Sequence, residues 1–424
     1  MRTRRLALAI GLLVLAGAAS GCLGALKGDG PSGPAAKATE MLLRPPGSDV
    51  QPTGRVRDFA LYLHPMPDHE LYPGSRMPMW GFSLSEDPST ARFPGPELRV
   101  TEGDTVVVRF RPLVADFTHT LHWHGQHVPF EMDGVPYVSQ EPVGPGQEFV
   151  YRFVAKPAGT YWYHCHVDTQ HHLDMGMYGA LIVEPQDPRA DPPFDVEFTM
   201  FLDEMDKYHI EGGNPQAQNT PQSGDPYDWV DYLQRTSQDA VNRNSRVQDA
   251  YGQANSPLRP NRDWYPETFP PYKVTYNTFL INGFAFPYTE PIVIPDGKTL
   301  RVRLINAGDM VHAMHLHGHH FLVTHKDGIL LESPWWADTV LIAPGERYDL
   351  YVVGNNPGIW DFHDHVNANT QNDRIWPGGM MTMLVYESFA DRLGGGGHDH
   401  GRHGSPGGLS RSGELVRWYD RVLP

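Results

Sequence analysis

A chain of 424 residues is long enough for two or three domains, and its 39 prolines and 43 glycines favour a turn-rich β architecture over long helices. The formal net charge of −16 argues against a nucleic-acid partner. The chain has two cysteines, Cys22 and Cys165, and if each has a separate role the fold contains no disulfide.

The chain begins with a pattern typical of an export signal. Arg4 and Arg5 precede an apolar run over residues 6–19, which is too short for a comfortable transmembrane span. The run ends in AASGC, which resembles a bacterial lipobox with Cys22 as the lipidated residue; an ordinary signal peptide with an incidental cysteine is the alternative. Residues 1–22 therefore predict export by the Sec or the twin-arginine route, and a lipid-anchored protein at the membrane surface, on the periplasmic or extracellular face.

A linker and then an internal repeat follow the signal. Residues 23–55 are rich in Gly, Pro, Ala and Lys, which is typical of a flexible tether. Beyond them, five segments recur in the same order: EGDTVVVRF and PDGKTLRVRL, HTLHWHG and HAMHLHG, VGPGQEFVYRF and IAPGERYDLYV, GTYWYHCH and GIWDFHDH, GMYGALIVE and GGMMTMLVYE. Such a repeat indicates a duplicated domain.

Each copy consists of short β-branched or aromatic runs, such as VVVRF and LRVRL, separated by Gly, Pro and Asp turns. This spacing predicts an all-β protein with a Greek-key β-sandwich in each copy. We place the first domain at residues 56–190 and the second at 191–388. The polar stretch at about 203–271 is too long for a simple connection and is either a functional lid or a solvated insertion. Residues 389–424 form a low-complexity tail rich in Gly and His.

Paired histidines are the strongest chemical signal in the chain. Four His-x-His pairs occur, two in each copy: His122/His124, His164/His166, His315/His317 and His363/His365. Residues i and i+2 of a strand project from the same face, so both members of a pair can reach one cavity. Cys165 lies between the members of the second pair and therefore points the opposite way. Imidazole and thiolate together suit copper and zinc.

On these motifs the chain resembles the two-domain multicopper oxidases of the laccase-like family, over roughly residues 56–388. The resemblance implies two cupredoxin-like domains and about four copper ions per chain, one of type 1 (blue), one of type 2 and two of type 3. It implies that His122 and His315 hold the type 2 copper. The type 3 coppers are then held by His124, His164, His166, His317, His363 and His365.

The blue copper is expected in the first domain alone. Such a site combines a thiolate, two imidazoles and a weak axial methionine, and by resemblance Cys165 is the thiolate and His119 the first imidazole. In the second copy Asp364 replaces the cysteine and no histidine follows at the required distance, although His312 is present. Asp364 either forms hydrogen bonds or relays protons where the thiolate would lie, or it is simply solvated.

The loop that carries the other blue-site ligands departs from the family pattern. In most relatives a histidine lies about five residues after the cysteine and a methionine about ten after it, but position 170 here is Gln. Counting back from the DMGM end restores the His-to-Met spacing of five with His172 and Met177. His171 and Met175 remain competitors for these two roles.

A carboxylate near the cluster completes the candidate site. Asp133 lies nine residues after His124, in the place where the family has an acid that orients water and supplies protons. Reduction of dioxygen to water consumes protons, so the chemistry requires a relay group. The alternative is an ordinary turn aspartate before Gly134.

The resemblance implies an oxidase that couples one-electron oxidation of a phenolic or metal-ion substrate to four-electron reduction of dioxygen to water. Because each domain supplies only half of the eight paired histidines, it also implies a homotrimer in which neighbouring subunits complete the cluster. A copper nitrite reductase, with a single type 2 copper, and a non-catalytic copper-binding or electron-transfer protein are the rival interpretations. The sequence does not specify the electron donor.

Overall fold

The computed structural model describes residues 41–42, 44–114, 118–207 and 276–393. The predicted signal at 1–22, the linker up to residue 40, the insertion from residue 208 and the tail from residue 394 lie outside the described residues. The chain divides into two units, Met1–Asp49 and Val50–Pro424, and both predicted domains lie in the second. Within the described residues, no helix is both long and apolar enough to span a membrane.

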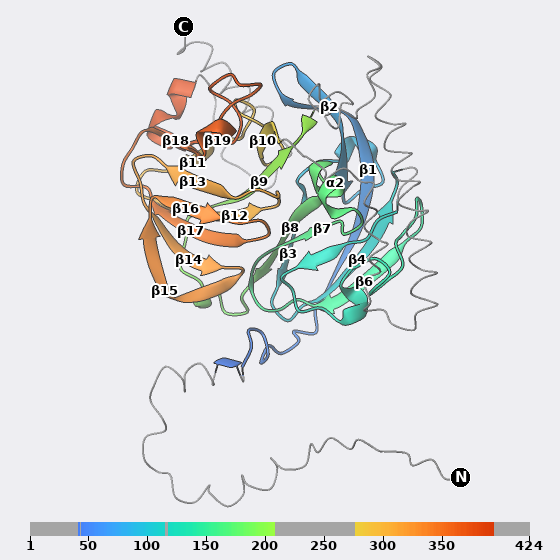
Figure 1. The fold of residues 1–424 in the computed structure, drawn as a ribbon. Helices are drawn as coiled ribbons and strands as arrows, with labels where there is room; N and C mark the ends of the chain where they lie inside the picture. Colours follow the sequence, from blue (N-terminus) through green and yellow to red (C-terminus); the bar gives the residue numbers. More distant parts are fainter. Residues whose placement is uncertain (1–40, 43, 115–117, 208–275, 394–424) are drawn as a thin grey trace, which may run out of the picture. The chain divides into compact units, whose positions relative to one another are not determined.

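The first half of the second unit contains two four-stranded sheets (Figure 1). One has the order β2-β1-β4-β6 and is built from β1 (Val56–Tyr72), β2 (Ser75–Ser83), β4 (Thr105–Pro112) and β6 (Phe149–Val154). The other has the order β3-β8-β7-β5 and is built from β3 (Gly95–Thr101), β5 (His122–His124), β7 (Gly159–His164) and β8 (Tyr178–Glu184). Side chains from both sheets, such as Val108, Phe82 and Leu181, form one buried core.

The second half repeats this arrangement with more strands. A six-stranded sheet of order β10-β9-β12-β17-β14-β15 comprises β9 (Val196–Met205), β10 (Thr278–Ile281), β12 (Thr299–Asn306), β14 (Phe321–Lys326), β15 (Ile329–Ala337) and β17 (Arg347–Val353). A five-stranded sheet of order β11-β19-β18-β13-β16 comprises β11 (Ile292–Ile294), β13 (His312–Leu316), β16 (Thr339–Ile342), β18 (Ile359–Asp364) and β19 (Met381–Tyr386). Leu304, Leu350 and Phe362 belong to their shared core.

The two halves also share their strand pairing. In each, one pair in each sheet is parallel, β1 with β4 and β3 with β8 in the first half, β9 with β12 and β11 with β19 in the second. Parallel neighbours within mostly antiparallel sheets require the chain to cross between sheets. The runs VVVRF and LRVRL lie inside β4 and β12. The prediction of an all-β chain with two β-sandwiches is therefore confirmed.

Helical elements among the described residues are short. They include α2 (Thr169–Asp174) and the 3-10 turns η1 (Pro88–Thr90), η2 (Phe130–Met132), η3 (Pro188–Ala190), η5 (Asn367–Asn369) and η6 (Glu387–Leu393). The predicted insertion begins within β9, because residues 203–205 belong to that buried strand. The chain therefore leaves the second sandwich later than its polar composition suggests.

A buried ion network fixes strand β7 against the second sandwich. Arg303 Nη1 donates to Thr160 Oγ1 at 2.7 Å, and Thr160 Oγ1 donates to Asp349 Oδ1 at 2.6 Å. Burial acts to raise the pKa of Asp349, but Arg303 and Arg301 outweigh it and hold this pKa at about 2. Removal of either partner of a buried ion pair strongly destabilises the fold, because it leaves the other charge buried and unpaired. Thr160 lies on β7, so the network holds the strand that leads to His164.

Candidate metal centres

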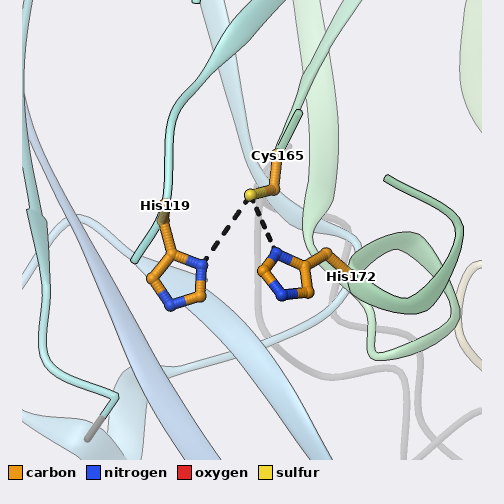
Figure 2. A group of neighbouring side chains, drawn as sticks. All are labelled: His119, Cys165 and His172. Atoms are coloured by element: carbon orange, nitrogen blue, oxygen red, sulfur yellow. Dashed lines mark hydrogen bonds between the residues drawn. The ribbon is translucent and has the colours of Figure 1, made fainter. Parts of the chain in front are cut away.

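Cys165, His119 and His172 gather into one buried group in the first sandwich (Figure 2). Cys165 directly follows β7, His119 pairs with Val143 in an isolated bridge, and His172 lies on α2. Cys165 Sγ is 3.1 Å from His172 Nδ1 and 3.7 Å from His119 Nδ1. The three donor atoms all lie within 4.8 Å of one another. One thiol and two imidazoles this close form a donor set that fits copper.

Burial sets the protonation state of this group. It lowers the pKa of His119 to about 3 and holds the pKa of His172 well below its usual value. It raises the pKa of the Cys165 thiol to about 12. The imidazoles are therefore already neutral, whereas the thiol must release its proton when a metal binds. The ring of Trp80 packs edge-on against His119 and His172, with centroids 5.8 and 5.2 Å away.

The loop after Cys165 separates the two candidate histidines. His172 is buried against the sulfur, whereas His171 is part of no donor group with Cys165 among the described residues. The main chain ties Met177 to both ligands, because its carbonyl accepts from the Cys165 N–H at 3.1 Å and its own N–H donates to the carbonyl of His172 at 3.0 Å. Met175 and Met177 are both fully buried, so the axial role of Met177 stays a prediction.

The first two histidine pairs form one cluster. Pairing of β5 with β7 places His122 opposite His164. Ring centroids of His122 lie 5.3 Å from His164 and 5.5 Å from His166, and the donor atoms of His122, His124 and His164 lie within 4.8 Å of one another. Trp123, between the paired residues, is fully buried in the core. The alternation of a strand thus aims imidazoles to one side and apolar bulk to the other.

The second two pairs form an equivalent cluster in the other sandwich. Pairing of β13 with β18 places His315 opposite His363. His315 lies 5.0 Å from His317 and 5.4 Å from His365 between ring centroids. The Nε2 atoms of His317 and His363 are 3.1 Å apart. We call these four residues the second histidine set, and the four around β5 and β7 the first histidine set.

Both sets orient their rings in the same way. Four histidines, two in each set, donate Nδ1–H to a main-chain carbonyl oxygen at 2.8 Å. The pairs are His122 with Asp133, His164 with Cys165, His315 with Asp338, and His363 with Asp364. This bond fixes the tautomer and leaves Nε2 free to bind a metal. His119 and His172, by contrast, turn Nδ1 toward the sulfur of Cys165.

The two sets do not meet within the chain. Across the part of the chain that the structure describes, no ring contact, hydrogen bond or donor group joins a histidine of one set to a histidine of the other. His124 instead faces Gly345, where an added Cβ would lie 3.0 Å from its Cε1 atom. His317 and His365 are exposed. Each set therefore presents four imidazoles that, among the described residues, do not reach the other set.

Asp133 lies beside the first set. It ends η2, and its Oδ1 is 3.3 Å from His122 Nδ1, the same nitrogen that bonds to its carbonyl. Its side chain is partly exposed, which suits exchange of protons with solvent. The structure thus places the predicted acid next to a predicted type 2 ligand, and its proton-relay role stays a prediction.

The second sandwich contains a different group where a blue site would lie. His312 donates Nδ1–H to Asp364 Oδ2 at 2.8 Å and Nε2–H to Glu204 Oε2 at 2.9 Å, and all three side chains are fully buried. The interpretation of Asp364 as a solvated carboxylate is therefore wrong, and the alternative in which it forms hydrogen bonds is confirmed. Burial acts to lower the pKa of His312, but the two carboxylates outweigh it and raise this pKa to about 9. The imidazole is accordingly charged.

Comparison with known proteins agrees with this geometry. Two family models described as multicopper oxidase match residues 90–188 and 257–387. The solved structure of the blue copper oxidase from Nitrosomonas europaea is 30% identical, with a TM-score of 0.62, and the match covers 85% of this chain and 95% of that one. The chain belongs to the multicopper oxidase family. Its two sandwiches are therefore cupredoxin-like, and copper is the metal that suits its donor groups.

Curated relatives of this multicopper oxidase family member are longer. The multicopper oxidase MmcO of Mycobacterium tuberculosis is 30% identical over 61% of this chain and 46% of its own length. The L-ascorbate oxidase of Cucumis sativus is 37% identical over 69% of this chain and 46% of its own length. The chain thus spans about half the length of these relatives.

Proposed function

We propose that the protein oxidises a phenolic or metal-ion substrate in one-electron steps and reduces dioxygen to water in a four-electron reaction. One observation carries this proposal: Cys165 enters the buried blue-site group while its chain neighbours His164 and His166 enter the first histidine set. The two groups are therefore joined by a few covalent bonds. Copper bound at both would supply one-electron redox chemistry and dioxygen binding.

The donor groups support about four copper ions per chain, in three kinds of site. Cys165, His119 and His172, together with Met177, would hold the blue copper. His122 and His315 hold the type 2 copper, and the other six histidines of the two sets hold the type 3 pair. Asp133 accepts and delivers protons beside His122, a role supported by its 3.3 Å approach to that ring.

Because the two sets do not meet within a chain, we further propose a homotrimer. The first set of one subunit faces the second set of its neighbour, and repetition of this head-to-tail contact closes a ring of three. Each ring then contains three complete eight-histidine sites.

Mixing inactive variants tests this arrangement directly. One chain carries His122→Ala and His124→Ala, and the other carries His315→Ala and His317→Ala. Each alone lacks complete sites, but in trimers formed from equal amounts of both, about a quarter of the contacts join two intact sets. Oxygen uptake should return to about that fraction. Mixed trimers that show no uptake would exclude the shared site, and a mixture of two first-set variants is the control.

Metal analysis and turnover separate the proposed oxidase from its rivals. The copper-loaded protein should contain close to four coppers per chain and consume oxygen with at least one donor from a panel of phenols and ferrous, manganous and cuprous ions. The acidic balance of the chain, −16, favours a metal-ion donor. Two coppers per chain with nitrite reduction would support a nitrite reductase. Bound copper without turnover of either kind would support a copper-handling protein.

Export and anchoring are also part of the proposal. They rest on the charged start, the apolar run and the AASGC motif of the sequence. Labelled palmitate should be incorporated into the protein and lost on Cys22→Ala, with the variant released from membranes. Labelling that persists in that variant would contradict an anchor at Cys22.

A further inference from the structure

One imidazole of the first histidine set is not oriented by a hydrogen bond. His122 and His164 each donate Nδ1–H to a main-chain carbonyl oxygen. In the described part of the chain, no hydrogen bond or ion pair reaches the ring of His124. The donor atoms of all three nevertheless lie within 4.8 Å of one another. Packing contacts must therefore hold the His124 ring in its place.

The indole of Trp162 provides the first of these contacts. Trp162 lies opposite His124 in the register of β5 and β7 and two residues before His164, so all three side chains project from one face of the sheet. Its ring stacks on His124 at 4.8 Å and 25°, and on His164 at 4.4 Å and 30°. Trp162 is also only 2% exposed. One flat, buried ring therefore sets the planes of two imidazoles.

The second histidine set lacks such a ring. In the repeat of GTYWYHCH as GIWDFHDH, Asp361 takes the position of Trp162, and His317 is the counterpart of His124. The Nε2 atoms of His317 and His363 lie 3.1 Å apart, so these two imidazoles bond to each other. In the first set the equivalent rings both stack on the indole instead. The indole thus keeps them from closing on each other.

The turn between β16 and β17 provides the second contact. Gly345 in this turn has a φ of +77°, and a Cβ added to it would lie 3.0 Å from Cε1 and 3.3 Å from Nε2 of His124. Any side chain there would push on the ring. Arg347 Nη1 donates to the carbonyl of Gly345 at 2.9 Å, and its Nε donates to the carbonyl of Thr160 at 3.3 Å. Because Thr160 lies two residues before Trp162, one buried arginine ties both contacts together.

We propose that Trp162 and Gly345 are positioning residues that hold the His124 imidazole ready for a copper ion. The inference rests on the proposed copper at the histidine sets and deepens it, because the second sandwich of a chain then shapes the first set of the same chain. A ring that is already oriented loses little rotational freedom when a metal binds. Groups that orient a ligand in this way contribute about 10–100-fold to metal affinity.

Alanine at two equivalent turn glycines gives the sharpest test. Gly146 in VGPGQ is the repeat counterpart of Gly345 in IAPGE, and its φ is +72°, but an added Cβ there would meet nothing within 4 Å. Gly345→Ala and Gly146→Ala therefore carry similar backbone strain, and only the first displaces His124. We expect Gly345→Ala to weaken copper binding at the histidine sets about 10–100-fold in competition with a chelator, and Gly146→Ala to leave it within about twofold. Blue absorption should persist in both and reports that the first sandwich is folded.

Replacing the indole tests the other contact. Trp162→Leu removes the flat ring and should weaken copper binding at the sets about 10–100-fold, whereas Trp162→Phe keeps a flat ring and should recover most of the affinity. Denaturant unfolding of the metal-free variants gives the stability of each. A positioning role predicts that Gly345→Ala and Gly146→Ala have similar stability and different copper affinity, which a purely structural role does not.

Two results would overturn the positioning role. One is equal copper affinity in the two glycine variants, and the other is a folded Trp162→Leu protein that binds copper as tightly as the unchanged chain. Copper binding requires no turnover, so a protein that meets these expectations but consumes no oxygen keeps the positioning role and overturns the oxidase. Normal oxygen uptake with the same copper affinity in every variant overturns the positioning role and leaves the oxidase standing.

Discussion

The two sandwiches place different groups at the same position of the same framework. Cys165 stands between His164 and His166 after β7, and Asp364 stands between His363 and His365 at the end of β18. The first group is a thiol between two neutral imidazoles. The second is an imidazolium held between two carboxylates, with every member buried.

The difference shows two ways of satisfying polar groups in a core. Buried polar atoms require hydrogen-bond partners, and a buried charged group also requires an opposite charge or a metal. In the first sandwich the donor atoms face one another, so a metal can satisfy all three. In the second, both ring nitrogens of His312 already bond to carboxylates on opposite sides, which leaves no nitrogen for a metal. In the second sandwich, hydrogen bonds within the chain satisfy the polar groups that a metal ion would satisfy in the first.

The largest effect is expected from replacing Cys165 by a polar residue of similar shape, and the same kind of replacement at Asp364 is the comparison. Cys165→Ser should abolish the blue absorption and lower turnover by about a thousandfold or more, because no thiolate remains to bind copper and accept electrons. Copper in the histidine sets should largely remain. Asp364→Asn should keep the blue spectrum. Blue absorption that survives in Cys165→Ser would show that the thiolate lies elsewhere.

The next largest effect is expected from the loop that contains α2. The corresponding loop after β18 in the second sandwich has no histidine at the matching position. His172→Ala should remove or severely weaken the blue absorption, because His172 Nδ1 lies 3.1 Å from the sulfur. His171→Ala should leave the spectrum nearly intact, since that ring belongs to no donor group with Cys165 among the described residues. Loss only in His171→Ala would transfer the ligand role to His171 and favour Met175 as its axial partner.

Disrupting the group of His312, Asp364 and Glu204 should lower the free energy of unfolding and leave the blue absorption unchanged. His312→Ala leaves Asp364 and Glu204 buried without their cation, and loss of one partner of a buried pair costs about 3–5 kcal/mol. Denaturant unfolding of the metal-free protein measures this loss. His64→Ala is the matched control, because His64 is similarly buried but, among the described residues, has one hydrogen bond, to the carbonyl of Ser85, and should lose less. Equal losses in both variants would mean that the charges contribute nothing beyond packing.

Opposite pH dependence should distinguish the two groups in the metal-free protein. The pKa of His312 is raised from 6.5 to about 9, so its contribution to stability is complete below pH 6.5 and is lost as the pH rises through 9, by roughly 3 kcal/mol. The pKa of His119 is lowered to about 3, so the unfolded chain binds the extra proton and stability falls as the pH drops below 6.5. Unfolding free energies across this range should lose the alkaline slope in His312→Ala and part of the acid slope in His119→Ala. An unchanged alkaline slope in the first variant would exclude a charged His312.

Much of this framework is readable from local sequence. Strand alternation explains why paired histidines share a face, and the repeated turns define both sandwiches. Counting back from the DMGM end predicts His172 as the ligand, and the structure places His172 against the sulfur. This count works because the main-chain hydrogen bonds of Met177 fix that end of the loop, while α2 accommodates the extra residues.

Glu204 shows where local sequence fails. In FLDEM it resembles the start of the polar insertion, but β9 is a buried strand whose carboxylates find partners far away in the chain. Asp203 accepts from the Tyr178 hydroxyl at 2.9 Å and Glu204 bonds to His312 at 2.9 Å. Such partners are tertiary, so no pattern within the strand identifies them. Two adjacent acids in an otherwise apolar run were the one available signal.

The smallest effect concerns the only carboxylate that approaches a ring of the first set in the described part of the chain. His122 has the Asp133 carboxylate 3.3 Å away, whereas the matching His315 has the Thr339 hydroxyl at 3.0 Å. If the acid relays protons, Asp133→Asn should lower kcat by about 10–100-fold and change the pH profile, with little change in KM or copper content. Glu131→Gln removes a charge two residues away and should leave kcat within about twofold. A kcat loss in Asp133→Asn that is matched by copper loss would show that the Asp133 carboxylate only helps to hold His122, through its 3.3 Å approach to Nδ1. The two domains would then differ in colour and charge but not in proton delivery.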